Sequence, residues 1–159
     1  MRASLNIYND LQKKKPFVLT LLTVDTHVPS GLQTPSCINI SKYQMKDFSK
    51  TPQMVQAAHC ADFVIGGFLE KILKDLPDNT IVILQSDHLQ TPRADAFLNL
   101  EMSPKRTNLF MAWGKNIGPQ IVKREAAMFD VAPTILGLMG RNPLGLNLGR
   151  DLMSKEKTL

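Results

Sequence analysis

Two groups of polar side chains in this sequence contain the residue types that bind cations and move protons, and each follows an apolar run. Asp87 and His88 come after TIVILQ, and Asp25 and His27 come after PFVLTLLTV. In open α/β sheets, ligands bind beyond the carboxyl ends of the strands, so both groups lie where a site is expected. A carboxylate beside an imidazole offers an oxygen and a nitrogen ligand, which suits Zn²⁺ or Mn²⁺.

Each of these residues also has a purely structural interpretation. Asp87 can cap the turn that follows it, with His88 exposed, and His27 can be a hydrogen-bonded residue at a strand end. A catalytic metal site usually takes at least three protein ligands. The remaining histidine, His59, lies in a predicted helix and is interpreted as a helix residue. The residues by themselves therefore indicate half of a metal site.

Other site chemistries have little support in the sequence. There is no GxSxG nucleophile motif, and the two cysteines, Cys37 and Cys60, lack the CxxC spacing of a zinc ribbon. The formal net charge of +5 suits phosphate-bearing partners. The basic residues are scattered apart from the lysines at 13–15 and near the end of the chain, and no aromatic residues are interleaved with them. We therefore expect no nucleic-acid partner.

The apolar pattern predicts the elements that position these residues. Continuous apolar runs typical of strands buried on both faces, or ending in polar turns, occur at 16–24, 80–85 and 107–113. Helices are expected over 6–14, 51–76 and 130–140. The long helix has Thr51 as its N-cap and Pro52 at its first position, and the last has Asp130 as its N-cap and Pro133 in its first turn. Strands that alternate with helices predict an α/β fold with a mainly parallel sheet flanked by helices.

Length and composition fit one globular domain. The chain has 159 residues, of which 43% are hydrophobic and 21% are charged. A chain of about 150 residues buries roughly two thirds of its unfolded surface, so no disulfide framework is required. The apolar runs are far shorter than the ~20 residues of a membrane-spanning helix, and the start resembles no signal peptide. Residues 28–50 show no periodicity and are expected to be mostly loop.

Several segments, in order and spacing, resemble a known family. They are PFVLTLLTVDTHVPSG, the cysteines in PSC and AAHC, TIVILQSDHL, KRTNLFMAWG, and FDVAPTILGLMG followed by LGLNLGRDL. Together they resemble the carboxyl-terminal part of the catalytic domain in the phosphoglycerol transferase I family of osmoregulated periplasmic glucan synthesis. That family is related to lipoteichoic acid synthases within the alkaline phosphatase and sulfatase superfamily. On this basis 1–15 is an amino-terminal helix or linker, 16–152 belongs to a sulfatase-like phosphotransferase domain, and 153–159 is a tail.

The resemblance implies roles for individual residues. Asp87 and His88 match the pair that binds the catalytic divalent cation, expected to be Mn²⁺, with Zn²⁺ or Mg²⁺ as alternatives. His27 matches the histidine that contacts the phosphoglycerol group, and Arg106 is a second substrate-binding candidate from a recurring segment. The implied location is the periplasmic face of the inner membrane, where Cys37 and Cys60 could form a disulfide.

The family reaction implied here has two displacement steps. A threonine hydroxyl attacks the phosphorus of phosphatidylglycerol and releases diacylglycerol, and a glucan hydroxyl then takes the phosphoglycerol from the enzyme. In the family that threonine and a further acidic ligand lie well upstream of VDTH. We therefore expect an incomplete fold that lacks its amino-terminal part, with no catalytic nucleophile in this chain and no turnover by the chain alone. The alternatives are a sulfatase or phosphodiesterase of the same fold, and a non-catalytic remnant that binds anions.

Overall fold

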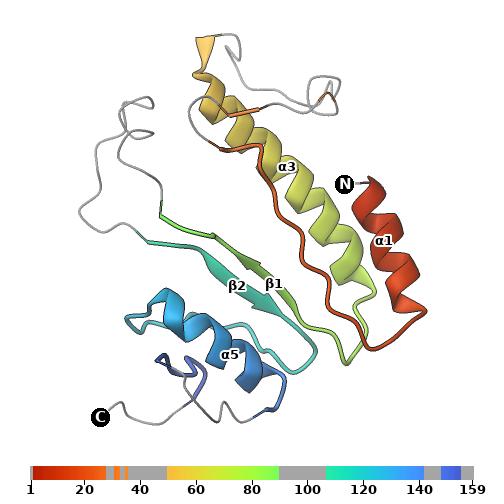
Figure 1. Ribbon diagram of the computed structural model, residues 1–159, viewed down its shortest axis with the longest axis vertical. Helices are drawn as coiled ribbons and strands as arrows, with labels where there is room; N and C mark the ends of the chain where they lie inside the picture. Colours follow the sequence, from red (N-terminus) through yellow and green to blue (C-terminus); the bar gives the residue numbers. More distant parts are fainter. Residues whose placement is uncertain are drawn as a thin grey trace. The chain divides into compact units, whose positions relative to one another are not determined.

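The computed structural model describes residues 2–27, 31–32, 35, 50–89, 107–141 and 148–154. The chain divides into two compact units. Unit 1 comprises Met1–Asp75 and Asp87–Asn108, and unit 2 comprises Leu76–Ser86 and Leu109–Leu159. The elements of each unit can be followed in Figure 1. Among the described residues, none of the helices combines the length and the hydrophobicity that crossing a bilayer requires.

Unit 1 begins with helix α1 (Arg2–Gln12), which confirms the short helix expected near the start of the chain. Tyr8 is the buried residue of this helix. Its ring meets the ring of Phe17 edge to face, with 6.2 Å between the centroids. Edge-to-face pairing is a favoured aromatic geometry. It ties the beginning of the segment that follows the helix to the helix itself.

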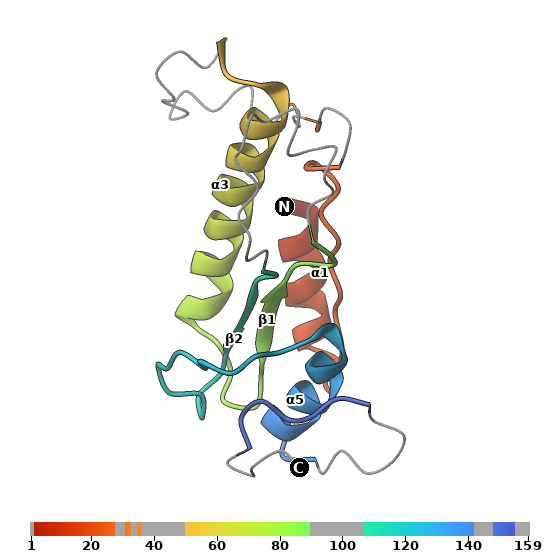
Figure 2. The ribbon, with the colours of Figure 1, turned by 90° about the vertical axis from the view of Figure 1, so that its left-hand side faces the viewer.

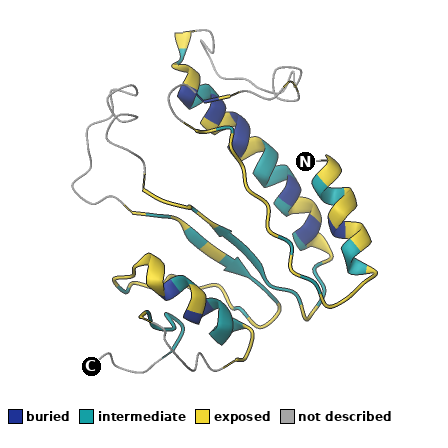
Figure 3. Cartoon of the chain, viewed as in Figure 1, coloured by how far each residue is buried: buried dark blue, intermediate teal, exposed yellow. Residues whose placement is uncertain are grey.

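The long helix α3 (Gln53–Lys74) confirms the helix predicted over 51–76. It begins one residue later than expected, because Pro52 rather than Thr51 occupies the N-cap position. Figure 3 shows its buried residues as a dark stripe along one side of the helix. The buried residues are Met54, Ala57, Cys60, Ala61, Phe68 and Ile72. Their spacings of three, four and seven residues, with Cys60 and Ala61 adjacent, place them on one face of the helix, as an amphipathic helix requires.

The sheet in the described part of the chain has two strands, β1 (Val82–Gln85) and β2 (Phe110–Trp113). They lie side by side in both views (Figures 1 and 2). They run antiparallel, with Val82 opposite Trp113 and Gln85 opposite Phe110. Strands were correctly predicted at both places, but the mainly parallel sheet is not found among the described residues. A short apolar run does not encode the direction of its neighbour, so this feature was not available from periodicity.

The strand predicted over 16–24 was wrong. This segment is extended but joins no ladder among the described residues. The expected burial on both faces is also absent, since Val18 is 89% exposed and Leu22 is 75% exposed. An apolar, β-branched run favours extended backbone, but a strand also needs a partner for its N–H and C=O groups. The sequence pattern indicated the first condition and contained no information on the second.

Unit 2 ends in a short 3₁₀ helix, η2 (Met128–Asp130), followed by α5 (Val131–Leu138). Asp130 is the N-cap residue of α5, and Pro133 lies in its first turn, as predicted. Gly140 follows the helix with a φ of +67°, a left-handed conformation that favours glycine at a helix end. The segment 148–154 returns to η2 and α5. It approaches so closely that a Cβ atom on Gly149 would overlap the carbonyl group of Phe129.

This close approach predicts that Gly149→Ala destabilises the protein. The added methyl group meets backbone atoms, which cannot rotate away, so we expect a loss of about 1–3 kcal/mol in the free energy of unfolding. Gly118→Ala is the matched control, because a Cβ there meets nothing within 4 Å. It should change the free energy by less than about 0.5 kcal/mol. Denaturant unfolding measures both variants, and equal stability of the two would contradict the close approach.

Candidate functional site

The candidate metal-binding pair lies directly beyond the β1–β2 ladder. After the last paired residue of β1, Ser86 continues the pairing with two further hydrogen bonds to Leu109. The Ser86 N–H donates to the Leu109 carbonyl at 3.0 Å, and the Leu109 N–H donates to Ser86 Oγ at 3.1 Å. At the end of the ladder, the hydroxyl of Ser86 thus accepts the hydrogen bond that a backbone carbonyl would otherwise accept. Asp87 is the first residue after this closure.

Asp87 and His88 are in contact with each other. His88 Nε2 lies 3.4 Å from Asp87 Oδ2, and the backbone N–H of His88 donates to Asp87 Oδ1 at 2.9 Å. Both side chains are open to solvent, with 69% of the Asp87 side chain and 66% of the His88 side chain exposed. The capping interpretation of Asp87 is therefore partly correct, since one carboxylate oxygen holds the turn. The other oxygen faces the imidazole.

A second hydrogen bond fixes which ring nitrogen of His88 carries a proton. Nδ1 lies 2.8 Å from the carbonyl oxygen of Leu89. A carbonyl oxygen only accepts, so Nδ1 must be the donor, and in the neutral ring Nε2 holds a lone pair. That lone pair faces the negatively charged Asp87 Oδ2. Two electron-rich atoms at this separation are stable together when a proton or a metal cation lies between them.

This arrangement has the chemistry of part of a metal site. Histidines that ligate metals usually donate their other ring N–H to a carbonyl or carboxylate, which orients the ring and holds the tautomer. Here the Leu89 carbonyl has that role. Within the described ranges no group of three or more His, Cys, Asp or Glu side chains could hold a metal. The pair therefore supplies two donors that fit a divalent cation, and a complete site needs more ligands than the described residues bring together.

His27 lies in a tight turn at the end of the extended segment. Its N–H donates to the Val24 carbonyl at 3.1 Å, and its own carbonyl accepts from the Gly31 N–H at 3.0 Å. The Gly31 carbonyl in turn accepts from Gln53 Nε2 at 3.3 Å, which ties the turn to the first residue of α3. These hydrogen bonds hold the His27 backbone in place. His27 itself is exposed, so its imidazole is accessible to solvent.

Of the other residues considered in the sequence, the structure describes Cys60 and His59. Arg106 and Cys37 lie outside the described residues. Cys60 is fully buried on α3 and its sulfur is part of a disulfide bond. The pairing with Cys37 stays a prediction. His59 is an exposed residue of α3, which confirms its interpretation as a helix residue.

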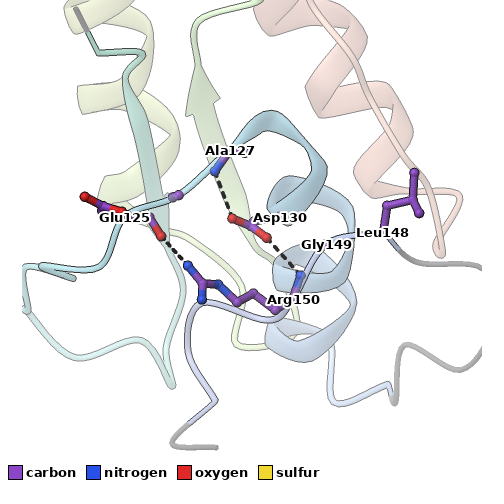
Figure 4. Close-up of a pocket in the computed structure, with 7 residues that line it drawn as sticks. Glu125, Ala127, Asp130, Leu148, Gly149 and Arg150 are labelled. Carbon is purple, nitrogen blue, oxygen red and sulfur yellow. Dashed lines mark hydrogen bonds between the residues drawn. The ribbon is translucent and has the colours of Figure 1, made fainter. Parts of the chain in front are cut away.

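A depression of about 510 Å³ lies in unit 2, where the segment 148–150 passes η2. Figure 4 shows its lining, which contains none of the residues that the sequence predicted for the site. The lining residues are Glu125, Ala126, Ala127, Asp130, Leu148, Gly149 and Arg150. Glu125 and Asp130 are the acidic residues of the lining, and Asp130 is the buried one. A buried carboxylate in a depression could act in a reaction only if its oxygens were available.

The Asp130 carboxylate is already occupied by hydrogen bonds from the protein backbone. One oxygen accepts from the Ala127 N–H at 2.8 Å and the other from the Arg150 N–H at 2.9 Å. Burial raises the pKa of Asp130, but these two hydrogen bonds and the Arg150 charge together outweigh it and hold the pKa below its usual value. A general acid or base needs a pKa near the working pH, and this carboxylate stays ionised. Asp130 is therefore a structural residue.

Thr134 extends the same network into α5. Its hydroxyl donates to the Asp130 carbonyl at 2.6 Å and accepts from the Leu152 N–H at 3.0 Å. Thr134 is 2% exposed and Asp130 is 6% exposed. The sequence indicated Asp130 only as an N-cap. Its second partner, twenty positions later in the chain, had no local signal.

The Sulfatase family model matches residues 3–141. The chain is 33% identical over 146 residues to phosphoglycerol transferase I of Xanthomonas campestris pv. campestris strain B100, covering 89% of this chain and 20% of the relative. It is 31% identical over 157 residues to phosphoglycerol transferase I of Escherichia coli O139:H28, covering 90% of this chain and 20% of the relative. The chain thus spans about a fifth of the length of these relatives. No solved structure matches it significantly.

The network around Asp130 predicts a specific loss of stability in acid. Because the folded-state pKa of Asp130 is lowered, its contribution is complete above the unfolded value of about 3.9 and is lost as the pH falls through the folded value. Asp130→Asn should lower the free energy of unfolding at neutral pH by about 1.5–3 kcal/mol, since a charged acceptor of two hydrogen bonds is lost. Denaturant unfolding from pH 7 to pH 2 should show a smaller decline for the variant than for the wild type.

The matched control is Asp78→Asn, which alters an exposed carboxylate that pairs with Lys115. Exposed ion pairs contribute at most about 1 kcal/mol, so this variant should follow the wild-type pH curve closely. An Asp130→Asn protein whose stability at neutral pH equals that of the wild type would contradict the structural role of Asp130.

Proposed function

Because this chain belongs to the sulfatase family, we propose that residues 16–152 form the carboxyl-terminal part of the catalytic domain of a metal-dependent phosphoglycerol transferase. The proposed reaction moves phosphoglycerol from phosphatidylglycerol to a periplasmic glucan. The order of the sequence segments and the similarity to two proteins named phosphoglycerol transferase I support the proposal. The proposed location is the periplasmic face of the inner membrane.

The observation that carries the proposal is the contact between Asp87 and His88 at the end of β1. Nε2 and Oδ2 face each other at 3.4 Å, and the other ring nitrogen, Nδ1, donates a hydrogen bond to the Leu89 carbonyl. This geometry leaves one nitrogen and one oxygen donor for the same cation. Mn²⁺ is the proposed ion, with Zn²⁺ or Mg²⁺ as alternatives. A bound divalent cation supplies Lewis acidity and offsets negative charge on phosphoryl oxygens.

His27 is proposed as the residue that meets the phosphoglycerol group. Its backbone is held by hydrogen bonds to Val24 and Gly31, which restrict where the exposed side chain can lie. An imidazole there can donate a hydrogen bond to a phosphoryl oxygen or move a proton to or from a departing hydroxyl. Arg106 is proposed as a second contact to the same anionic group, since a guanidinium binds phosphate through paired hydrogen bonds.

The remaining parts of the proposed reaction come from outside this chain. In the transfer, the nucleophilic oxygen forms a bond to phosphorus as the bond to diacylglycerol breaks, and a glucan hydroxyl later replaces the nucleophile. A threonine in another part of a longer polypeptide is the proposed nucleophile, together with further metal ligands there. The chain alone is therefore proposed to be inactive. Disulfide pairing of Cys60 with Cys37 is also part of the proposal.

Hydrolysis is the second candidate, and the family match itself favours it. The matching model is named for sulfatases, and water in place of the glucan hydroxyl would turn the same two displacements into hydrolysis. The two reactions differ in their second acceptor. Product analysis with and without added glucan therefore separates them.

The first test measures Mn²⁺ binding to the 159-residue chain by the loss of the free-ion electron paramagnetic resonance signal. Asp87→Ala and His88→Ala should each weaken binding by at least about tenfold, because each removes one of two donors. Binding should also weaken as the pH falls, since protons compete with the metal for Nε2. Asp10→Ala and His59→Ala, which alter one exposed residue of each type, are the matched controls. Unchanged binding in the Asp87 and His88 variants would contradict the metal assignment.

The second test joins this chain to the amino-terminal part of a related phosphoglycerol transferase and measures transfer from phosphatidylglycerol. Asp87→Ala and His88→Ala should abolish transfer to glucan, while His59→Ala should leave it intact. Undiminished transfer in the first two variants would exclude the pair from the reaction. Phosphoglycerol released to water, with or without glucan, would favour the hydrolase instead.

A further inference from the structure

Gly31 is the residue through which the turn of His27 packs against α3. Its φ of +70° is a left-handed conformation that residues with a Cβ atom rarely adopt. A Cβ atom on Gly31 would also lie 2.6 Å from Ala57 Cβ and 3.4 Å from the sulfur of Met54. Ala57 is fully buried and Met54 is 6% exposed. Two separate constraints, one of conformation and one of space, therefore require glycine where the turn meets the helix.

Backbone hydrogen bonds join the two ends of this turn. The Leu32 N–H donates to the Asp25 carbonyl at 2.6 Å, and the Gly31 N–H donates to the His27 carbonyl at 3.0 Å. His27 thus lies between residues that are bonded to each other. Because these bonds flank His27, the place of Gly31 on α3 restricts where His27 can lie.

The side chain of Gln53 adds a directional bond between α3 and the turn. Gln53 is the first residue of the helix, and its Nε2 donates to the Gly31 carbonyl at 3.3 Å, across 22 positions of sequence. Gln56, three positions later, donates from its Nε2 to the Thr51 carbonyl at 2.8 Å. Two neighbouring glutamines therefore make the same kind of bond, one to the turn of His27 and the other to the residues that lead into the helix.

We propose that Gly31 and Gln53 are positioning residues for His27. They fix the turn on the first turn of α3 and thereby hold the imidazole where it meets the phosphoglycerol group. The role of that imidazole rests on the proposed function, and both residues act through His27 without contacting the substrate. His27 is exposed, so restraints on its backbone contribute strongly to the position of its ring. A displacement of about 1 Å can lower the rate of a reaction by roughly a hundredfold.

Nuclear magnetic resonance of the 159-residue chain with ¹³C-labelled histidine rings tests the restraint directly. The chain has three histidines, so each ring signal can be assigned with an alanine variant. Gln53→Ala and Gly31→Ala should each shift the ring signal of His27, while the signals of His59 and His88 stay in place. Gln53→Ala is the milder change, because it removes one hydrogen bond and introduces no clash.

Gln56→Ala and Gly66→Ala are the matched controls on the same helix. The first removes a glutamine bond to Thr51, and the second adds a Cβ atom that meets nothing within 4 Å. Both should leave the His27 signal unchanged. The proposal is wrong if the His27 signal of Gln53→Ala coincides with that of the wild type, or if Gln56→Ala moves it equally far.

A double-mutant cycle separates positioning from a general structural role. It uses the polypeptide that joins this chain to the amino-terminal part of a related phosphoglycerol transferase. Gln53→Ala should lower kcat for transfer by about tenfold with little change in KM, since a misplaced ring costs mainly the chemical step. In a His27→Ala background the residual transfer should not fall further, because the ring that Gln53 positions is gone.

The outcomes of the cycle and of the resonance experiment are distinct. An equal loss of transfer in both backgrounds would overturn the positioning role of Gln53. A joined polypeptide without any transfer activity would contradict the proposed function, and the ring signals of the 159-residue chain would still decide whether Gly31 and Gln53 hold His27.

Discussion

The antiparallel pairing of β1 with β2 is the interaction on which the candidate site depends. A two-stranded sheet is marginally stable in water, so every hydrogen bond along it matters for the residues at its end. Ser86 lengthens this ladder by using both its N–H and its hydroxyl to hold Leu109. Asp87 and His88 follow immediately, so the ladder defines where their backbone begins, although their side chains are exposed.

A single carboxylate organises the end of unit 2 in a comparable way. Asp130 accepts hydrogen bonds from the residue before η2 and from Arg150, and its backbone carbonyl accepts from Thr134. These bonds draw the segment around Gly149 against η2, where only a residue without a side chain fits. The same bonds make Asp130 unsuitable for proton transfer. An acidic residue in a depression is therefore a structural feature here.

The segment at 16–24 shows where prediction from sequence reaches its limit. Its composition correctly indicated extended backbone, and the polar turn at its end was placed correctly. Whether an extended segment becomes a strand depends on a partner that supplies hydrogen bonds, and no such partner is found among the described residues.

The sequence by itself determined the helices, the positions of β1 and β2, and the identity of the Asp87–His88 pair. Helix periodicity, caps and apolar runs act between residues a few positions apart, so they can be read directly. Only the tertiary structure decided that Gln85 pairs with Phe110 in the antiparallel sense and that Asp130 binds Arg150. It also decided which nitrogen of His88 faces the carboxylate. These features depend on distances between atoms in the folded chain, and residue order alone does not specify them.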